Sequence, residues 1–147
     1  MNKRVLVPAI LLIGTLTSAA PLLAHHSFNM FDVRAEAEIM LEGVVKEWNF
    51  TNPHSWLTIT VTNPDGTQAD WSFEAAAAAA LVPKKITINT YKVGDKVKVA
   101  GGPLRDGRKG AILKFVQHAD GSFTLPNDAG SIGQEALDRW KAKAGVK

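Results

Sequence analysis

The side chains in this sequence with the clearest potential for chemistry are its four histidines. His25 and His26 are adjacent, His54 follows a proline, and His118 comes much later in the chain. The sequence has no cysteine, which excludes a disulfide, an iron–sulfur cluster, a thiolate metal site and a cysteine nucleophile. Imidazole sites remain open, because histidine is the commonest metal ligand in proteins.

Chemistry at His25 depends on where the mature chain begins. A short basic start precedes an apolar stretch, residues 5–16, and small residues follow it. This stretch is shorter than the roughly 20 apolar residues that a spanning helix needs. Residues 1–24 are therefore predicted to be a cleaved signal peptide rather than a retained anchor. Cleavage after Ala19 and cleavage after Ala24 both fit, and only the second makes His25 the mature N-terminus.

The positive charge of the chain belongs mainly to this signal. The 17 Lys and Arg exceed the 14 Asp and Glu by three. Removal of residues 1–24 takes away two basic residues and no acidic ones, so the net charge falls to +1. Phosphate binding needs a clustered basic surface, so we expect no nucleic-acid partner. The mature protein is expected in the periplasm or outside the cell, with no membrane span after processing.

Strands are the elements that must position the histidines. The first predicted strand changes its alternation near Gly43, which is typical of a bulge. The second alternates cleanly and places Leu57, Ile59 and Val61 on one face. The predicted strands are residues 38–50, 55–62, 68–74, 96–100 and 111–118.

Two helices are predicted around these strands. The six alanines of residues 75–80, followed by Pro83, favour a short helix between the third and fourth strands. Residues 101–110 are predicted to be a flexible loop. Residues 126–147 read as a polar tail with one helix, residues 132–144, on which Leu137, Trp140 and Ala144 form a narrow apolar stripe.

This order of elements predicts a mainly β fold. A long bent first strand, with a helix between strands three and four, is the pattern of a five-stranded OB-like Greek-key barrel. The predicted organisation is a signal peptide at 1–24, a barrel at 25–125 and a tail with a short helix at 126–147.

The histidines suggest a metal site. If the mature chain begins at His25, its α-amine and imidazole can chelate one ion, and the imidazole of His54 would add a third nitrogen. His26 could replace either imidazole. Such nitrogen sets suit copper(II) first. The plain alternative is that the paired histidines are solvated and that His54 bonds only to backbone.

A second hypothesis concerns aromatic side chains rather than a metal. Trp48 and Trp56 lie in the first two strands, where OB barrels bind oligomeric ligands, and Trp56 is out of phase with its apolar neighbours. An interaction module that binds a periplasmic protein or a glycan is therefore the alternative function. The sequence carries no phosphate loop, nucleophile elbow or His-Glu-x-x-His motif, so an enzyme that uses histidine-bound copper is the weakest reading.

Several of these segments together resemble a known family. They are His-His-Ser-Phe at residues 25–28, Phe-Asp at 31–32, Lys-Glu-Trp at 46–48, Thr-Asn-Pro-His-Ser-Trp at 51–56 and Val-Gly-Asp at 93–95. The chain is similar to small exported bacterial proteins of unknown function with an N-terminal His-His-Ser-Phe signature. The resemblance implies a periplasmic or secreted location and cleavage near His25. The family usually has a Ser-Pro-Asn helix start and an Arg-Gly-Trp segment where this chain has its alanine run.

Overall fold

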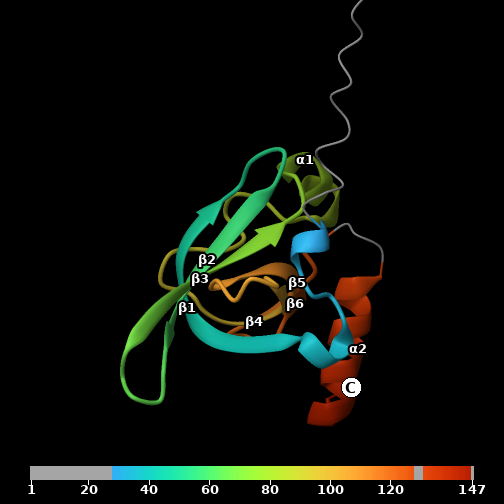
Figure 1. The fold of residues 1–147 in the computed structure, drawn as a ribbon. Coiled ribbons are helices and arrows are strands. Elements are labelled where there is room, and N and C mark those ends of the chain that lie inside the picture. The colour runs from blue at the N-terminus through green and yellow to red at the C-terminus, as the bar shows by residue number, and fades with distance from the viewer. Residues whose placement is uncertain (1–27, 128–130, 147) are drawn as a thin grey trace, which may run out of the picture.

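The strands expected from the sequence are present in the computed structural model, which describes residues 28–127 and 131–146. The predicted signal peptide, His25 and His26 lie outside the described residues. Figure 1 shows the strands as a barrel with the C-terminal helix beside it. The strands are β1 (Ile39–Asn49), β2 (Ser55–Thr62), β3 (Gln68–Ala75), β4 (Lys96–Pro103), β5 (Gly110–His118) and β6 (Phe123–Thr124).

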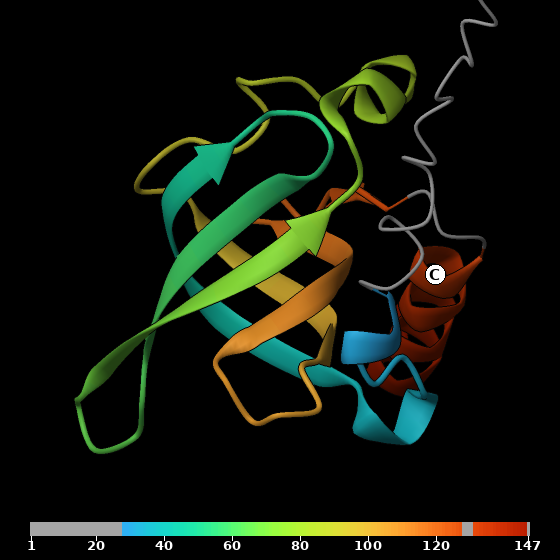
Figure 2. The ribbon, with the colours of Figure 1, turned by 45° about the horizontal axis from the view of Figure 1, so that its top comes forward.

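Strands β1 to β5 close into a mixed barrel. Their hydrogen-bonded order is β3-β2-β1-β4-β5, and a parallel pairing of β3 with β5 completes the ring. All other neighbours are antiparallel, and β6 adds a short edge to β5. The crossing strands are clearest in Figure 2. This arrangement confirms the predicted five-stranded OB-like barrel.

Four short helical turns and one longer helix accompany the strands in residues 28–127 and 131–146. The short helix after β3 is α1 (Ala78–Leu81), and α2 (Ile132–Ala144) is the C-terminal helix. Three 3₁₀ turns are η1 (Phe28–Met30), η2 (Ala35–Ala37) and η3 (Val82–Lys84). None of the helices in the described part of the chain is long and apolar enough to cross a membrane.

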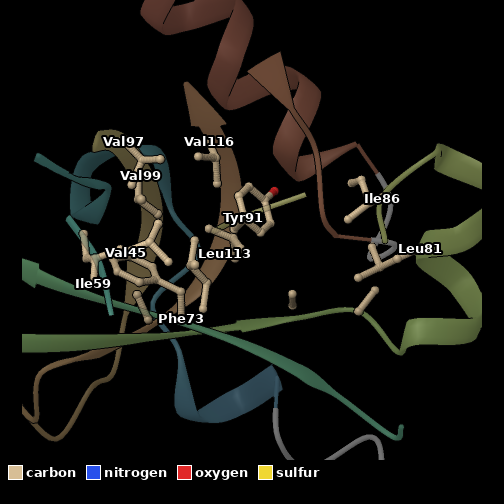
Figure 3. Close-up of a cluster of buried hydrophobic side chains, with 14 of the residues drawn as sticks. Val45, Ile59, Phe73, Leu81, Ile86, Tyr91, Val97, Val99, Leu113 and Val116 are labelled. Carbon is tan, nitrogen blue, oxygen red and sulfur yellow. The ribbon is translucent and has the colours of Figure 1, made fainter. Parts of the chain in front are cut away.

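The barrel interior is filled by the faces that the alternation predicted. Leu57 and Ile59 of β2 are fully buried, and Phe73 of β3 lies opposite Leu57 in register. Figure 3 shows Ile59 and Phe73 converging with Val99 of β4 and Leu113 of β5. A second apolar cluster lies outside the barrel wall, where α2 covers Phe115 with Ala136 and Leu137.

Glycines account for two differences from the prediction. The bulge in β1 falls between Val45 and Glu47 rather than at Gly43. Gly43 serves a close approach instead, since a Cβ there would lie 2.7 Å from the carbonyl oxygen of Thr60. The predicted loop at 101–110 was wrong at its start, because β4 continues through Gly101 and Gly102. A Cβ at Gly101 would lie 2.8 Å from that of Ala111, so only glycine lets β4 and β5 meet there.

The two helices also differ in detail from the expectation. The first three alanines of the run extend β3 and its exit, so α1 begins only at Ala78. Helix α2 has the predicted bounds, but Ala144 is exposed and Ala136 is buried in its place. Leu137 and Trp140 of the predicted stripe do pack against the second apolar cluster, so the prediction was wrong only at Ala144.

Candidate functional site

The loop between β1 and β2 holds His54 in a fixed position. Ser55 is fully buried, and its hydroxyl donates to the carbonyl of Thr51 at 3.1 Å. That carbonyl also accepts the backbone N–H of Ala78 at 3.0 Å, and the side chain of Asn52 accepts from Ala79 at 3.2 Å. The loop, whose Asn52–Pro53 peptide bond is cis, is thus tied to the start of α1.

A buried carboxylate contacts His54. The imidazole Nδ1 lies 3.1 Å from Oε1 of Glu74, near the end of β3. Glu74 is buried, and the loss of solvent raises its pKa, while the nearby His54 opposes that shift. The contact occupies the Nδ1 side of the ring, and Nε2 has no hydrogen bond to any residue within 28–127 or 131–146. This leaves Nε2 as the ring nitrogen with a position open to a further ligand.

Trp56 lies on the same outer face of the barrel. It pairs with Glu74 across the β2–β3 ladder and with Asn49 across the β1–β2 ladder. Directly opposed side chains in a ladder share one face, so the exposed indole lies beside the carboxylate that contacts His54. The expected exposure of Trp56 is confirmed.

Trp48 has a different environment. It is half-buried against the barrel core, and its indole N–H donates to the carbonyl of Thr87 at 3.0 Å. Its ring meets Tyr91 edge-on, with centroids 4.8 Å apart. The structure therefore places Trp48 in the packing between β1 and the segment before β4, away from the exposed face around Trp56.

The chain that carries the N-terminal histidines crosses the outer face near Glu74. Asp32 donates its backbone N–H to Pro103 at 2.8 Å, and a Cβ on Gly102 would lie 2.6 Å from the carbonyl of Asp32. Gly102 pairs with Ile112, which in turn pairs with Glu74. Two strand spacings make about 10 Å between the backbones of Gly102 and Glu74.

This spacing is within reach of the histidines. Five residues separate His26 from Asp32, and with residues 28–30 in the 3₁₀ turn η1 that length of chain can span about 17 Å. The position of Asp32 therefore allows His25 and His26 to approach His54. Their own placement lies outside the described residues.

Two other side chains that carry possible ligand atoms, Asp32 and Met40, have different partners. The carboxylate of Asp32 accepts from the Arg34 guanidinium at 2.6 Å and from Arg105 at 3.4 Å. Met40 packs against the cluster under α2. Between residues 28 and 127, and in 131–146, no group of three His, Asp or Glu side chains could hold a metal ion.

His118 has a structural role at the other end of β5. Its Nε2 shares a hydrogen bond of 3.1 Å with the hydroxyl of Thr124, which also bonds the hydroxyl of Tyr91 at 2.6 Å. The rings of Tyr91 and His118 stack with centroids 5.5 Å apart. A shallow hollow of about 350 Å³ beside His118 is lined by polar residues of β4 and β5, and it does not include His54.

Comparison with known proteins places the chain in a family. Residues 13–113, about two thirds of the chain, match a family of unknown function, DUF6152. The chain belongs to this family. For this DUF6152 member, the matched range includes both N-terminal histidines, His54, Trp56 and Glu74. No curated protein and no solved structure matches the sequence. The family supplies no activity, so the function must be argued from the site.

Glu74 is the part of the site that sequence reasoning missed. In the sequence it alternates with Trp71 and Phe73, which is the pattern of a solvent-facing side chain on a strand. The signal was present in the hairpin, because the turn at residues 63–67 pairs Thr62 with Gln68 and so sets Trp56 opposite Glu74. His54, two positions before Trp56, is then close to the carboxylate of Glu74.

Proposed function

We propose that this protein is exported and binds one metal ion, copper first, between its mature N-terminus and His54. The ligands are the α-amine and imidazole of His25, with Nε2 of His54 as the ligand from the barrel. His26 is the alternative imidazole. The observation that carries the proposal is the 3.1 Å contact between Nδ1 of His54 and the buried carboxylate of Glu74.

A carboxylate on the far side of an imidazole is a common feature of metal sites. It fixes the ring orientation and makes the metal-facing nitrogen more basic. Glu74 stands on a barrel strand, and the loop of His54 is bonded to α1, so the ligand is held by rigid elements. A histidine that only filled surface space would need no such support.

Nitrogen ligands favour copper over the hard cations. Copper(II) prefers tetragonal nitrogen sites and lies at the top of the divalent series. An α-amine has a pKa near 8, so a metal readily displaces its proton at neutral pH. The chain offers no thiolate that would favour a zinc site of the structural type.

The alternative function uses the outer face around Trp56. The exposed indole beside Glu74 favours it, because a surface tryptophan can anchor a protein or a glycan. Binding of such a partner in the absence of metal, with a change in tryptophan fluorescence, would support this alternative against the metal site.

Copper titration of the processed protein tests the proposal. Intact mass first establishes that the chain begins at His25. Replacement of a carboxylate behind a metal-bound imidazole typically lowers affinity 10- to 100-fold, which is the loss we expect for Glu74→Gln. Glu47→Gln is the matched control, since Glu47 is exposed on β1. His25→Ala and His54→Ala should each weaken binding further. Equal, weak binding by all four variants and the parent would overturn the proposal.

A further inference from the structure

The most exposed large apolar side chains of the described residues lie in one segment. Val82 is 55 % exposed, Ile88 64 % and Val93 77 %, whereas no other large apolar side chain in the described part exceeds 46 %. All three belong to residues 82–93, which connect α1 to β4 and are called here the 82–93 segment. Figures 1 and 2 show it at the end of the barrel that also carries α1.

Hydrogen-bonded turns hold two of these side chains outward. Thr87 donates its N–H to the hydroxyl of Thr90 at 2.8 Å, and Thr90 donates back to the carbonyl of Thr87 at 3.1 Å, so Ile88 is at the tip of a closed turn. Val82 opens η3, whose turn is closed by the N–H of Lys85 at 2.9 Å. Neither side chain can fold back onto the barrel without breaking its turn.

The third turn and two buried anchors complete the arrangement. Asp95 closes the turn around Val93, since its carboxylate accepts the N–H of Lys92 at 2.8 Å and its own N–H donates to Lys92 at 3.0 Å. Between the turns, Ile86 and Tyr91 are buried in the core, as Figure 3 shows. The 82–93 segment is therefore fixed to the barrel while its apolar tips face solvent.

The charge of the 82–93 segment is entirely positive. It contains Lys84, Lys85 and Lys92, and no acidic residue occurs between Glu74 and Asp95. Lys84 donates to the carbonyl of Asn127, whereas Lys85 and Lys92 form no ion pair with any part of the chain that the structure describes. The exposed apolar tips thus lie among three lysines, with the carboxylate of Asp95 at the base of the Val93 turn.

We propose that the 82–93 segment docks on an anionic lipid surface. Val82, Ile88 and Val93 enter the headgroup layer, and the neighbouring lysines face the lipid phosphates. The protein lies on the bilayer and does not cross it. The surface binds phospholipid headgroups of negative charge as a class and does not depend on the metal site.

The composition favours lipid over a protein partner. Cores of protein–protein interfaces are depleted in lysine and take their energy from tryptophan, tyrosine and arginine. The 82–93 segment has three lysines among small branched side chains, and its one aromatic residue, Tyr91, is buried. Separate apolar tips on three turns suit a fluid interface, which needs no matching pockets.

Sedimentation with vesicles tests this proposal on the metal-free protein. The parent should bind vesicles of equal phosphatidylglycerol and phosphatidylcholine, bind pure phosphatidylcholine far less, and lose affinity as salt is raised. Each lysine near an anionic surface is worth about a five-fold change in affinity, so Lys85→Gln with Lys92→Gln should weaken binding about 25-fold. The triple change of Val82, Ile88 and Val93 to Ser should weaken it at least ten-fold.

Matched variants control for net charge and for general hydrophobicity. Lys109→Gln with Lys143→Gln removes the same charge from exposed positions elsewhere, and Met30→Ser with Val146→Ser removes exposed apolar groups elsewhere. Both should bind like the parent. All variants are prepared with the same processed N-terminus as the parent, so they differ only at the substituted positions. Absence of binding to the anionic vesicles, or equal losses in the control and test variants, would overturn the proposal.

Discussion

A buried ion pair between β5 and the chain before β1 makes a quantitative prediction. The Lys114 side chain is 1 % exposed, and its Nζ lies 2.8 Å from Oε2 of Glu38 and 3.1 Å from the carbonyl of Val33. Arg139 of α2 donates to the same carboxylate oxygen at 2.9 Å. Glu38 therefore neutralises a cation that has no access to water and links α2 to the chain that leads toward the N-terminal histidines.

Glu38→Gln should destabilise the protein by about 3 kcal/mol. Removal of one partner of a buried pair typically costs 3–5 kcal/mol, because the remaining charge stays desolvated. The lower end applies here, since glutamine keeps an oxygen that can accept from Lys114. The half-exposed Arg139 can turn to solvent and adds little. For a domain of this size the change corresponds to a fall in Tm of about 12 °C.

Lys114→Met should behave differently. Methionine has a similar length, and Glu38 would keep Arg139 as its partner, so we expect a change within about 1 kcal/mol. The double variant Glu38→Gln with Lys114→Met has no buried unpaired cation, so it should recover most of the stability lost in Glu38→Gln. Glu42→Gln is the control, because Glu42 is 72 % exposed and 3.4 Å from Lys98, and it should change stability by less than about 0.5 kcal/mol.

Urea denaturation at pH 7, followed by tryptophan fluorescence, measures all four variants. Equal free energies of unfolding for Glu38→Gln and Glu42→Gln would refute the reasoning. A loss in Lys114→Met as large as that in Glu38→Gln would refute it as well, because it would show that the ion pair itself stabilises the fold.

Three further predictions concern single side chains. The hydrogen-bonding Arg34 guanidinium holds the pKa of Asp32 well below its usual range. The parent should therefore be more stable than Asp32→Asn by a constant amount above pH 5, and urea titrations should show that this difference shrinks below pH 4. Gly43→Ala should lower the free energy of unfolding in urea by about 1–3 kcal/mol, because the new methyl group meets the Thr60 carbonyl, and an unchanged value would contradict that contact. Burial raises the pKa of Tyr91, the only tyrosine of the chain. Ultraviolet titration of the folded protein should therefore show no phenolate in the usual range near pH 10. Ionisation of Tyr91 in that range would contradict its burial.

Much of the fold follows from local pattern. Alternation in residues 55–62 and the turn that follows them fix β2 with its observed bounds. The helical spacing of residues 132–144 likewise gives α2. Gly101 and Gly102 misled the prediction, because a Gly-Gly-Pro run is typical of loops. Their role depends on the approach of β5 and of Asp32, which are distant in sequence.

The site was less accessible to sequence reasoning than the fold. His54 could be chosen because its residue type and loop are unusual, whereas Glu74 acts through strand register. The burial of Lys114 has no local signal at all, since an alternating strand gives the same pattern whether its lysine faces water or a helix. Such partners depend on long-range packing, which residue periodicity does not encode.

The central claim is that the N-terminal histidines and His54 share one metal ion, and a single NMR titration tests it. Copper(II) is added below one equivalent to the processed protein while the ring signals of all four histidines are followed. His118 is the internal control, because it lies six residues along β5 from the partner of Glu74, about 20 Å of strand. We expect the signals of His25, His26 and His54 to broaden together while that of His118 stays sharp. Broadening of the N-terminal histidines alone, with His54 unchanged, would contradict it.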